Sequence, residues 1–198
     1  MADNDVTPGA DTRQSALAAF WAEGRAAEFE TSTISLREDR TCHKLILRGD
    51  GTDVFARTVE ACTGSPLPAD DQALSVHDPC CLKLADNEWL IASTNRPALD
   101  RELAASLHSS HARIFNADSA WVRIRLSGSA ANRLLARGCN QDFHPSKFSV
   151  GRFCHTEIAR IPVIIFQRDD RNDFDIYVDR SLAMDAWLWL RDTAREMT

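Results

Sequence analysis

The residues from His77 to Cys81 include three side chains of the kinds that bind zinc. His77 lies three residues before the adjacent pair Cys80 and Cys81. Neighbouring residues of a strand point to opposite faces of a sheet, so the two thiols are poorly placed for one tetrahedral ion. Neither this spacing nor Cys154-His155 repeats as a Cys-x-x-Cys or His-x-x-x-His pair. Packed free cysteines are therefore the favoured interpretation, and a metal-binding module using these three residues is the weaker hypothesis.

Nucleophilic, acid–base and nucleotide chemistry have equally weak support. The stretch 127–129, Ser-Gly-Ser, lacks the flanking glycines of a Gly-x-Ser-x-Gly elbow and indicates a strand-to-helix turn. The carboxylate pairs Asp70-Asp71 and Asp169-Asp170 lie among turn residues, where solvation keeps them from acid–base work. The chain has neither a Gly-x-Gly-x-x-Gly fingerprint nor a phosphate-binding loop. We therefore predict that it contains no catalytic, cofactor-binding or metal-binding residues.

Large aromatic side chains instead suggest a surface for a partner protein. The loop 142–148 carries two phenylalanines, a histidine and a proline, and it either folds back on its own domain or docks on a partner. The last helix is apolar over more than half its circumference, which is typical of a helix buried on two sides. The candidate partner interface consists of Phe143, His144, Pro145, Phe148, Trp187 and Trp189.

Hydrophobic periodicity predicts the elements that position these residues. Residues 1–12 are expected to form a flexible acidic arm, followed by a helix over 13–29 and strands over 31–37 and 43–48. The rest of the first half is expected to contain a helix capped by Thr52 and ended by Gly64, a hairpin of strands 81–85 and 88–93, and a helix opened by Pro97. Those of the second half are a strand over 121–126, a helix over 130–137 ended by Gly138, a strand-rich segment over 155–166, a strand over 174–178 and a helix capped by Ser181.

The two halves show a weak internal repeat. Segment 47–49 corresponds to 126–128, and segment 89–91 to 174–176, at nearly equal offsets. Helices interleaved with mostly antiparallel strands indicate an α+β fold. We expect two duplicated, intertwined ferredoxin-like units packed as one body, with an arm and short helix over 1–30 and repeats over about 31–115 and 116–198.

Composition excludes several classes of partner. The chain has 198 residues, 44% of them apolar, and 23 basic against 29 acidic residues give a net charge of −6. Nucleic-acid binding needs a dense positive patch, so we expect no nucleic-acid partner. The longest apolar run, 161–166, is far shorter than the roughly 20 residues of a membrane helix. We expect no secretory signal, no membrane partner, a cytoplasmic location and six free cysteines.

An ordered series of motifs runs through most of the chain. In the second half it comprises residues 126–135, Gly138-Cys139, 142–145, Phe148, Gly151, Thr156, 174–178, Arg180-Ser181, Ala183, Trp187 and Leu190; in the first half it comprises 44–49, Leu67-Pro68 and 87–91. This series, which covers roughly residues 30 to 195, resembles the gamma subunit of heterotetrameric sarcosine oxidase. That family is related to the folate-binding aminomethyltransferase fold.

The resemblance implies a small, non-catalytic subunit beside alpha, beta and delta chains. It implies that the large chains carry NAD, FAD, FMN and tetrahydrofolate, and that this chain carries no cofactor. The complex would demethylate sarcosine oxidatively to glycine, giving 5,10-methylenetetrahydrofolate or formaldehyde, and hydrogen peroxide. The alternatives are a free-standing folate-binding one-carbon transfer protein and the equivalent subunit of another N-methyl amino acid dehydrogenase.

Overall fold

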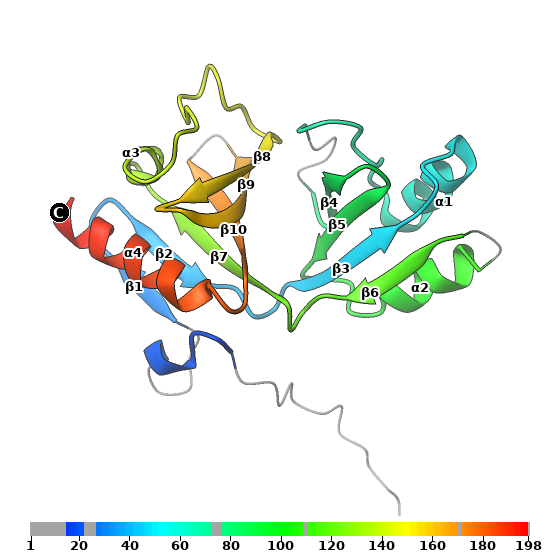
Figure 1. Ribbon diagram of the computed structural model, residues 1–198, viewed down its shortest axis with the longest axis horizontal. Coiled ribbons are helices and arrows are strands. Elements are labelled where there is room, and N and C mark those ends of the chain that lie inside the picture. The colour runs from blue at the N-terminus through cyan, green and yellow to red at the C-terminus, as the bar shows by residue number, and fades with distance from the viewer. Residues whose placement is uncertain (1–14, 22–26, 73–76, 109–110, 170–171, 198) are drawn as a thin grey trace, which may run out of the picture.

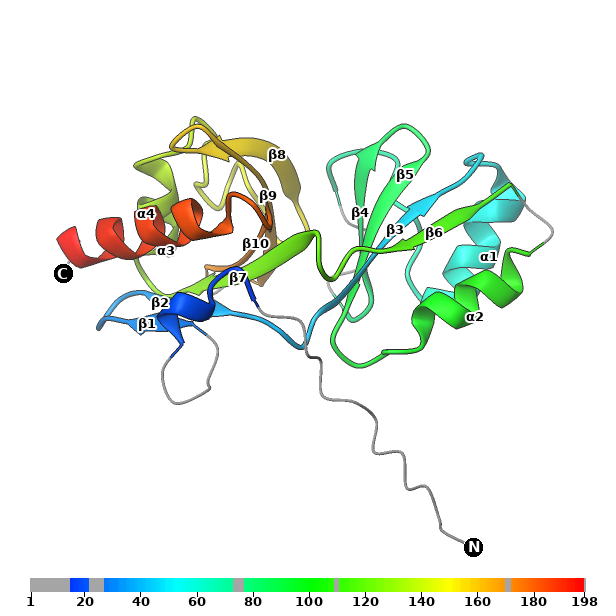
Figure 2. The same ribbon diagram turned by 60° about the horizontal axis from the view of Figure 1, so that its bottom comes forward.

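Two antiparallel sheets lie between two outer pairs of helices in the computed structural model (Figure 1). The structure describes residues 15–21, 27–72, 77–108, 111–169 and 172–197. Helices α1 and α2 cover the four-stranded sheet, and α3 and α4 cover the six-stranded sheet, as a second view also shows (Figure 2). The layers therefore follow the order helix, sheet, sheet, helix, which confirms the predicted α+β class.

The four-stranded sheet is one ferredoxin-like unit. In chain order its elements are β3 (His43–Arg48), α1 (Asp53–Thr63), β4 (Cys80–Ala85), β5 (Glu88–Ser93), α2 (Leu99–Ser106) and β6 (Arg113–Asn116). The strand order is β4-β5-β3-β6, with every neighbouring pair antiparallel. This β-α-β-β-α-β arrangement is the split unit predicted for each repeat.

The six-stranded sheet contains the second unit, whose fourth strand comes from an earlier part of the chain. Its elements are β1 (Glu28–Glu30), β2 (Ser35–Glu38), β7 (Trp121–Ser127), α3 (Ala131–Ala136), β8 (Phe153–Ile158), β9 (Ile161–Asp169), β10 (Asp173–Asp179) and α4 (Ala183–Glu196). The order β9-β10-β7-β2 repeats β4-β5-β3-β6. The fourth strand of the second unit is thus β2, which comes from near the N-terminus.

Strand register supports the internal repeat. Leu47 pairs with Trp89 in the first unit, and Leu126 pairs with Phe174 in the second. These are the same four positions whose spacing indicated the duplication. The predicted division at residues 30 and 115 itself stays a prediction, and β1 and β2 pair within the sheet that holds β7.

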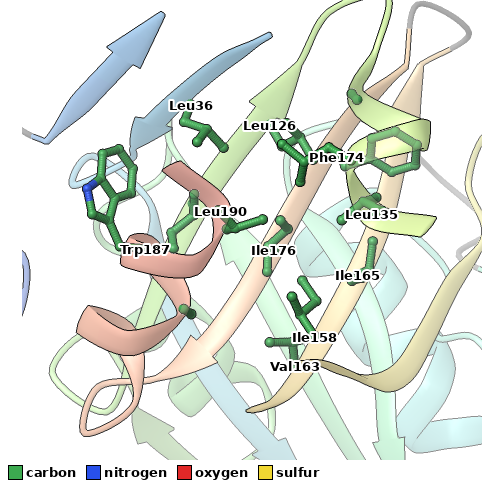
Figure 3. Packing of buried hydrophobic residues seen from close by; sticks show 14 of the residues in the cluster. Leu36, Leu126, Leu135, Ile158, Val163, Ile165, Phe174, Ile176, Trp187 and Leu190 are labelled. Atoms are coloured by element: carbon green, nitrogen blue, oxygen red, sulfur yellow. The ribbon is translucent and has the colours of Figure 1, made fainter. Parts of the chain in front are cut away.

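Alternating side chains give each sheet two buried faces. A helix-side core lies between the six-stranded sheet and helices α3 and α4, and Figure 3 shows Leu126, Ile165, Ile176 and Leu190 meeting in it. An intersheet core of small and aromatic residues joins the two sheets, and its buried members are Cys42, Cys80, Leu82, Leu90, Ala92, Phe153, Ile164, Phe166 and Tyr177.

The predicted helix over 13–29 is wrong over the described part of that range. Only residues Ala18–Phe20 form a short 3-10 helix, and Glu28–Glu30 form the edge strand β1. Leu17 is fully buried in the helix-side core, and the Trp21 indole donates a hydrogen bond to Glu38 Oε2 at 2.8 Å. These contacts with the sheet override the local amphipathic pattern.

The predicted caps met different outcomes. The Thr52 hydroxyl accepts a hydrogen bond from Phe55 N at 3.4 Å, and Gly64 ends α1 with φ of 71°, as predicted. Ser181 does not cap α4, because its amide and hydroxyl both donate to Asp179 Oδ1. Leu182 is the N-cap residue of α4 and makes no side-chain cap bond.

Two segments of strand structure also differ from the prediction. The strand-rich segment 155–166 is a hairpin of β8 and β9 that turns at Ala159 and Arg160. Strand β6 was not predicted, because its burial pattern is mostly exposed and it shows no alternation.

Candidate functional site

Charged side chains gather on the inner face of the six-stranded sheet, beside the intersheet core. Along β7, Val122, Ile124 and Leu126 face the helices. Arg123 and Arg125 therefore point the other way, towards the second sheet. Strand β10 places Tyr177 opposite Arg123 and Asp175 opposite Arg125.

Asp175 is the centre of this charged cluster, which comprises Asp39, Arg123, Arg125, Arg168, Asp173 and Asp175. Its Oδ2 lies 3.3 Å from Arg123 Nη1 and 3.0 Å from Arg168 Nη1, and its Oδ1 lies 3.8 Å from Arg125 Nε. The side chains of Asp175 and Arg123 are only 1% and 3% exposed. Buried ions of this kind persist only when they are paired.

Arg123 also bonds to Asp39, in the segment that leads from β2 to β3. The cluster therefore connects the six-stranded sheet to the chain segment that enters the other sheet. Burial opposes the charge of Arg123, but its anionic neighbours, among them Asp175 and Asp39, outweigh it and raise the arginine's pKa. Burial likewise opposes ionisation of Asp39, yet Arg123 and Thr41 lower its pKa. Both groups stay ionised at neutral pH, which suits a structural bridge and not proton transfer.

A small cavity of about 70 Å³ lies at the joint between the two units. Lys44 and Asp118 line it. The Lys44 ammonium is almost fully buried and donates to Cys42 O at 2.8 Å, while Asp118 Oδ1 accepts from Lys44 N at 2.6 Å. His43 Nδ1 lies 3.2 Å from Asp118 Oδ2. These groups satisfy one another, and the cavity is much smaller than the 300 Å³ or more of typical cofactor pockets.

The aromatic side chains of the predicted interface are mostly buried inside the chain. Phe143, Phe148 and Trp187 are at most 3% exposed. The Phe143 ring lies 5.0 Å from that of Phe148 and 5.8 Å from that of Phe174, both edge-on. The loop therefore folds back on its own domain, and these three residues are corrected from interface to core. Burying their apolar area in the helix-side core is more favourable than leaving it exposed.

The other three predicted interface residues remain accessible. His144 and Pro145 are exposed, and Trp189 is half-buried. The His144 Nδ1 lies 2.8 Å from Ser146 Oγ, in a local turn begun by Asp142. No other protein is present in the structure, so their role in an interface stays a prediction.

The structure places the two cysteines of the hypothetical metal site on opposite faces of a strand. Cys80 lies in the intersheet core, whereas Cys81 lies on the opposite face of β4, in the core beneath α1 and α2. Burial raises the pKa of Cys81 to about 12 and that of Cys80 well above its ordinary value. Both are therefore protonated thiols. Within the described ranges, His, Cys, Asp and Glu form no group of three or more able to hold a metal ion.

Sequence reasoning missed the charged cluster. The alternation of arginines with apolar residues predicted the strand over 121–126, but nothing local shows that a second sheet covers the arginine face. The available signal was the equally alternating β10, where Asp173 and Asp175 are opposite in charge to the arginines and Asp175 pairs directly with Arg125. Opposite charges at matching positions of paired strands suggest cross-strand ion pairs.

Comparison with protein families decides the family. The model of the "Sarcosine oxidase, gamma subunit family" matches residues 48–196, most of the chain. The chain belongs to the sarcosine oxidase gamma subunit family.

Known gamma subunits match it along nearly their whole length. "Sarcosine oxidase subunit gamma" of Corynebacterium sp. strain U-96 is 28% identical over 201 residues, covering 100% of this chain and 98% of that protein. The subunit of Corynebacterium sp. strain P-1 is 29% identical over 174 residues, covering 87% and 85%. A chain in the structure of the heterotetrameric sarcosine oxidase from Corynebacterium sp. U-96 superposes with a TM-score of 0.82 at 29% identity, covering 93% of this chain and 95% of that one.

A more distant likeness confirms the predicted fold. The glycine cleavage system aminomethyltransferase T from Bartonella henselae superposes with a TM-score of 0.57 at 16% identity. The match covers 84% of this chain but 46% of that one. The fold is thus aminomethyltransferase-like. None of the described helices is long and apolar enough to cross a membrane.

Proposed function

We propose that the chain serves as the gamma subunit of a heterotetrameric sarcosine oxidase, alongside alpha, beta and delta subunits in the cytoplasm. The observation that carries this proposal is the end-to-end match, in sequence and in fold, with a chain of the Corynebacterium enzyme. Because the whole length matches, the proposal concerns the entire chain and not one shared module.

The proposed role is structural. The complex would oxidise sarcosine to glycine and give 5,10-methylenetetrahydrofolate or formaldehyde, together with hydrogen peroxide. We assign NAD, FAD, FMN and tetrahydrofolate to the large subunits. At the joint of this chain, Arg123 pairs with Asp39 and Asp175, so these buried charges serve the fold.

Because the fold resembles that of an aminomethyltransferase, we asked whether this chain could bind folate. The residues present do not fit that ligand at the joint of the two units. The cavity there measures about 70 Å³. Lys44 and Asp118, which line it, already pair with one another. We therefore derive no catalytic step for this chain.

Coexpression with the other three subunits of the same organism tests the proposal. The chain should copurify in a stable complex, and sarcosine-dependent hydrogen peroxide should appear with the complex but not with the chain alone. A chain that stays monomeric in the presence of the other subunits would rule the proposal out.

Calorimetry distinguishes the proposed subunit role from the first alternative, a free-standing folate-binding protein. Tight binding of tetrahydrofolate to the isolated chain would favour a free-standing one-carbon transfer protein. The second alternative, a subunit of another N-methyl amino acid dehydrogenase, is decided by comparing sarcosine with other N-methyl amines as substrates of the complex.

A further inference from the structure

An open groove crosses the outer side of the six-stranded sheet, where the end of α3, the β8–β9 turn and α4 meet. We call it the Trp189 groove, and its volume is about 360 Å³. It is lined by residues 136–140, Glu157, Ala159, Arg160 and Trp189. Helices α3 and α4 lie beside one another on this side of the sheet (Figures 1 and 2).

The groove is positive on a chain that is negative overall. Its charged lining residues are Arg137, Arg160 and Glu157, two cations and one anion, whereas the whole chain carries −6. Among the described residues, the exposed Arg160 guanidinium has no ion-pair partner. Arg137 faces Glu196 at 3.5 Å, but both side chains are about half or more exposed. Such a surface pair contributes little and exchanges readily for another carboxylate.

The turn beside the groove places two non-glycine residues in the left-handed region of backbone conformation, and the second of them is Arg160. Ala159 and Arg160 have φ of 50° and 71°, and both are exposed. A two-residue hairpin with both φ positive strongly prefers Asn-Gly, because glycine carries no Cβ penalty there. The exposed Arg160 side chain has no packing role in the core that would offset this cost. Strain of this kind is characteristic of positions that serve a binding role.

The floor of the groove is closely fitted. A Cβ at Gly138 would lie 2.4 Å from the Trp189 ring, so the indole packs directly on the backbone at the end of α3. The amide of Ala159 donates to Gly138 O at 2.8 Å, which fixes the turn against the same point. The Trp189 ring and the backbone of the turn that carries Arg160 are therefore held in place before any partner binds.

We propose that the Trp189 groove docks an acidic segment of another subunit of the complex, with a carboxylate of that segment bound by Arg160 and Arg137. The proposal rests on the proposed function, because it requires an assembly. Arginine binds carboxylates through two parallel hydrogen bonds, and a half-buried indole provides a flat apolar contact for the rest of the segment. The charge complementarity selects an acidic segment over an apolar one.

The decisive variant is Arg160→Gly. Glycine accepts the positive φ, so the melting temperature of the isolated chain should stay equal or rise by about 2 °C. Binding to the preassembled remaining subunits, followed by biolayer interferometry, should weaken about tenfold or more, and its salt dependence should become shallower. Asn87→Gly is the matched control. It replaces a residue with φ of 59° in the other unit and should leave binding unchanged.

The outcomes separate the two proposals. If Arg160→Gly binds with the affinity and salt dependence of the wild-type chain, the groove proposal is overturned while the subunit role stands. If the wild-type chain itself does not bind the other subunits, both proposals fall. Selective loss of affinity in Arg160→Gly, with wild-type binding by Asn87→Gly, supports the groove.

Discussion

Replacing Asp175 by asparagine tests the charged cluster between the sheets. The amide has the shape of the carboxylate, so the change leaves no cavity and removes only the charge. Three guanidiniums then lose their shared partner, at present 3.0 to 3.8 Å away. Arg125 and Arg168 are 39% and 28% exposed and can turn to solvent. Arg123 is buried and must rely on Asp39 alone.

The expected cost therefore falls mainly on Arg123. Removing one partner of a buried ion pair costs about 3–5 kcal/mol, and the lower end applies because two of the three arginines can be rehydrated. For a chain of this size, about 3 kcal/mol lowers the melting temperature by about 6–12 °C.

Urea unfolding followed by circular dichroism measures this free energy, and Asp173→Asn is the control. Within the described part of the chain, the ion-pair partner of Asp173 is the partly exposed Arg125, at 3.4 Å. Burial, together with repulsion from Asp169 and Asp175, raises its pKa despite the attraction of Arg125. Its charge therefore stabilises little, and the control should stay within about 1 kcal/mol of wild type. An equally small loss in Asp175→Asn would refute the bridging role of the cluster.

Three further predictions concern acid stability and the aromatic loop. The fold lowers the pKa of Asp39, so its ionised form stabilises the chain above a pH of about 4. This contribution is lost as the pH falls through the folded-state pKa. Urea midpoints measured between pH 3 and 7 should therefore fall less steeply with decreasing pH in Asp39→Asn than in wild type. Phe148→Ala should destabilise the chain by about 3–5 kcal/mol, since the ring is fully buried, and a loss below 1 kcal/mol in thermal unfolding would contradict its placement in the core. His144→Ala should change the melting temperature by less than about 2 °C, because the ring is exposed, and a larger drop in differential scanning fluorimetry would show that the turn is structural.

Much of the fold was predictable because it depends on short-range patterns. The pairs Leu47–Trp89 and Leu126–Phe174 were visible as a repeated spacing, and the register places them at matching points of the two sheets. Caps such as Thr52 and Gly64 act within one turn of helix, so their residue types carry the signal.

The exchanged strand was not predictable in the same way. Strand β2 completes the sheet of the second unit by pairing with β7, almost ninety residues later in the sequence. No local pattern distinguishes that partner from β3, the next strand in the chain. Residues Glu28–Glu30 join the same sheet by pairing with β2, and Leu17 packs into the helix-side core, which is why the helix prediction failed over the described part of 13–29.

The residues of the candidate site likewise include some features that were predictable from residue type and others that depend on the fold. The aromatic type of Phe143 and Phe148 showed that they must be buried, but only the fold shows that they are buried in the helix-side core of this chain, with Phe143 against Phe174 of β10. Trp189 differs from Trp187 because a glycine at position 138 lets its ring lie at the surface, on the backbone. Arg160 is distinguished by its φ of 71°, which its residue type gives no reason to expect.

The most direct test of the central claim is the native mass of the complex purified from cells that express this chain with the other three subunits. The proposed role predicts a four-chain complex that contains one copy of this chain and produces hydrogen peroxide from sarcosine, while the purified chain alone produces none. A complex of the other three subunits that leaves this coexpressed chain unbound, or sarcosine oxidation by the chain alone, would contradict the role of a non-catalytic gamma subunit.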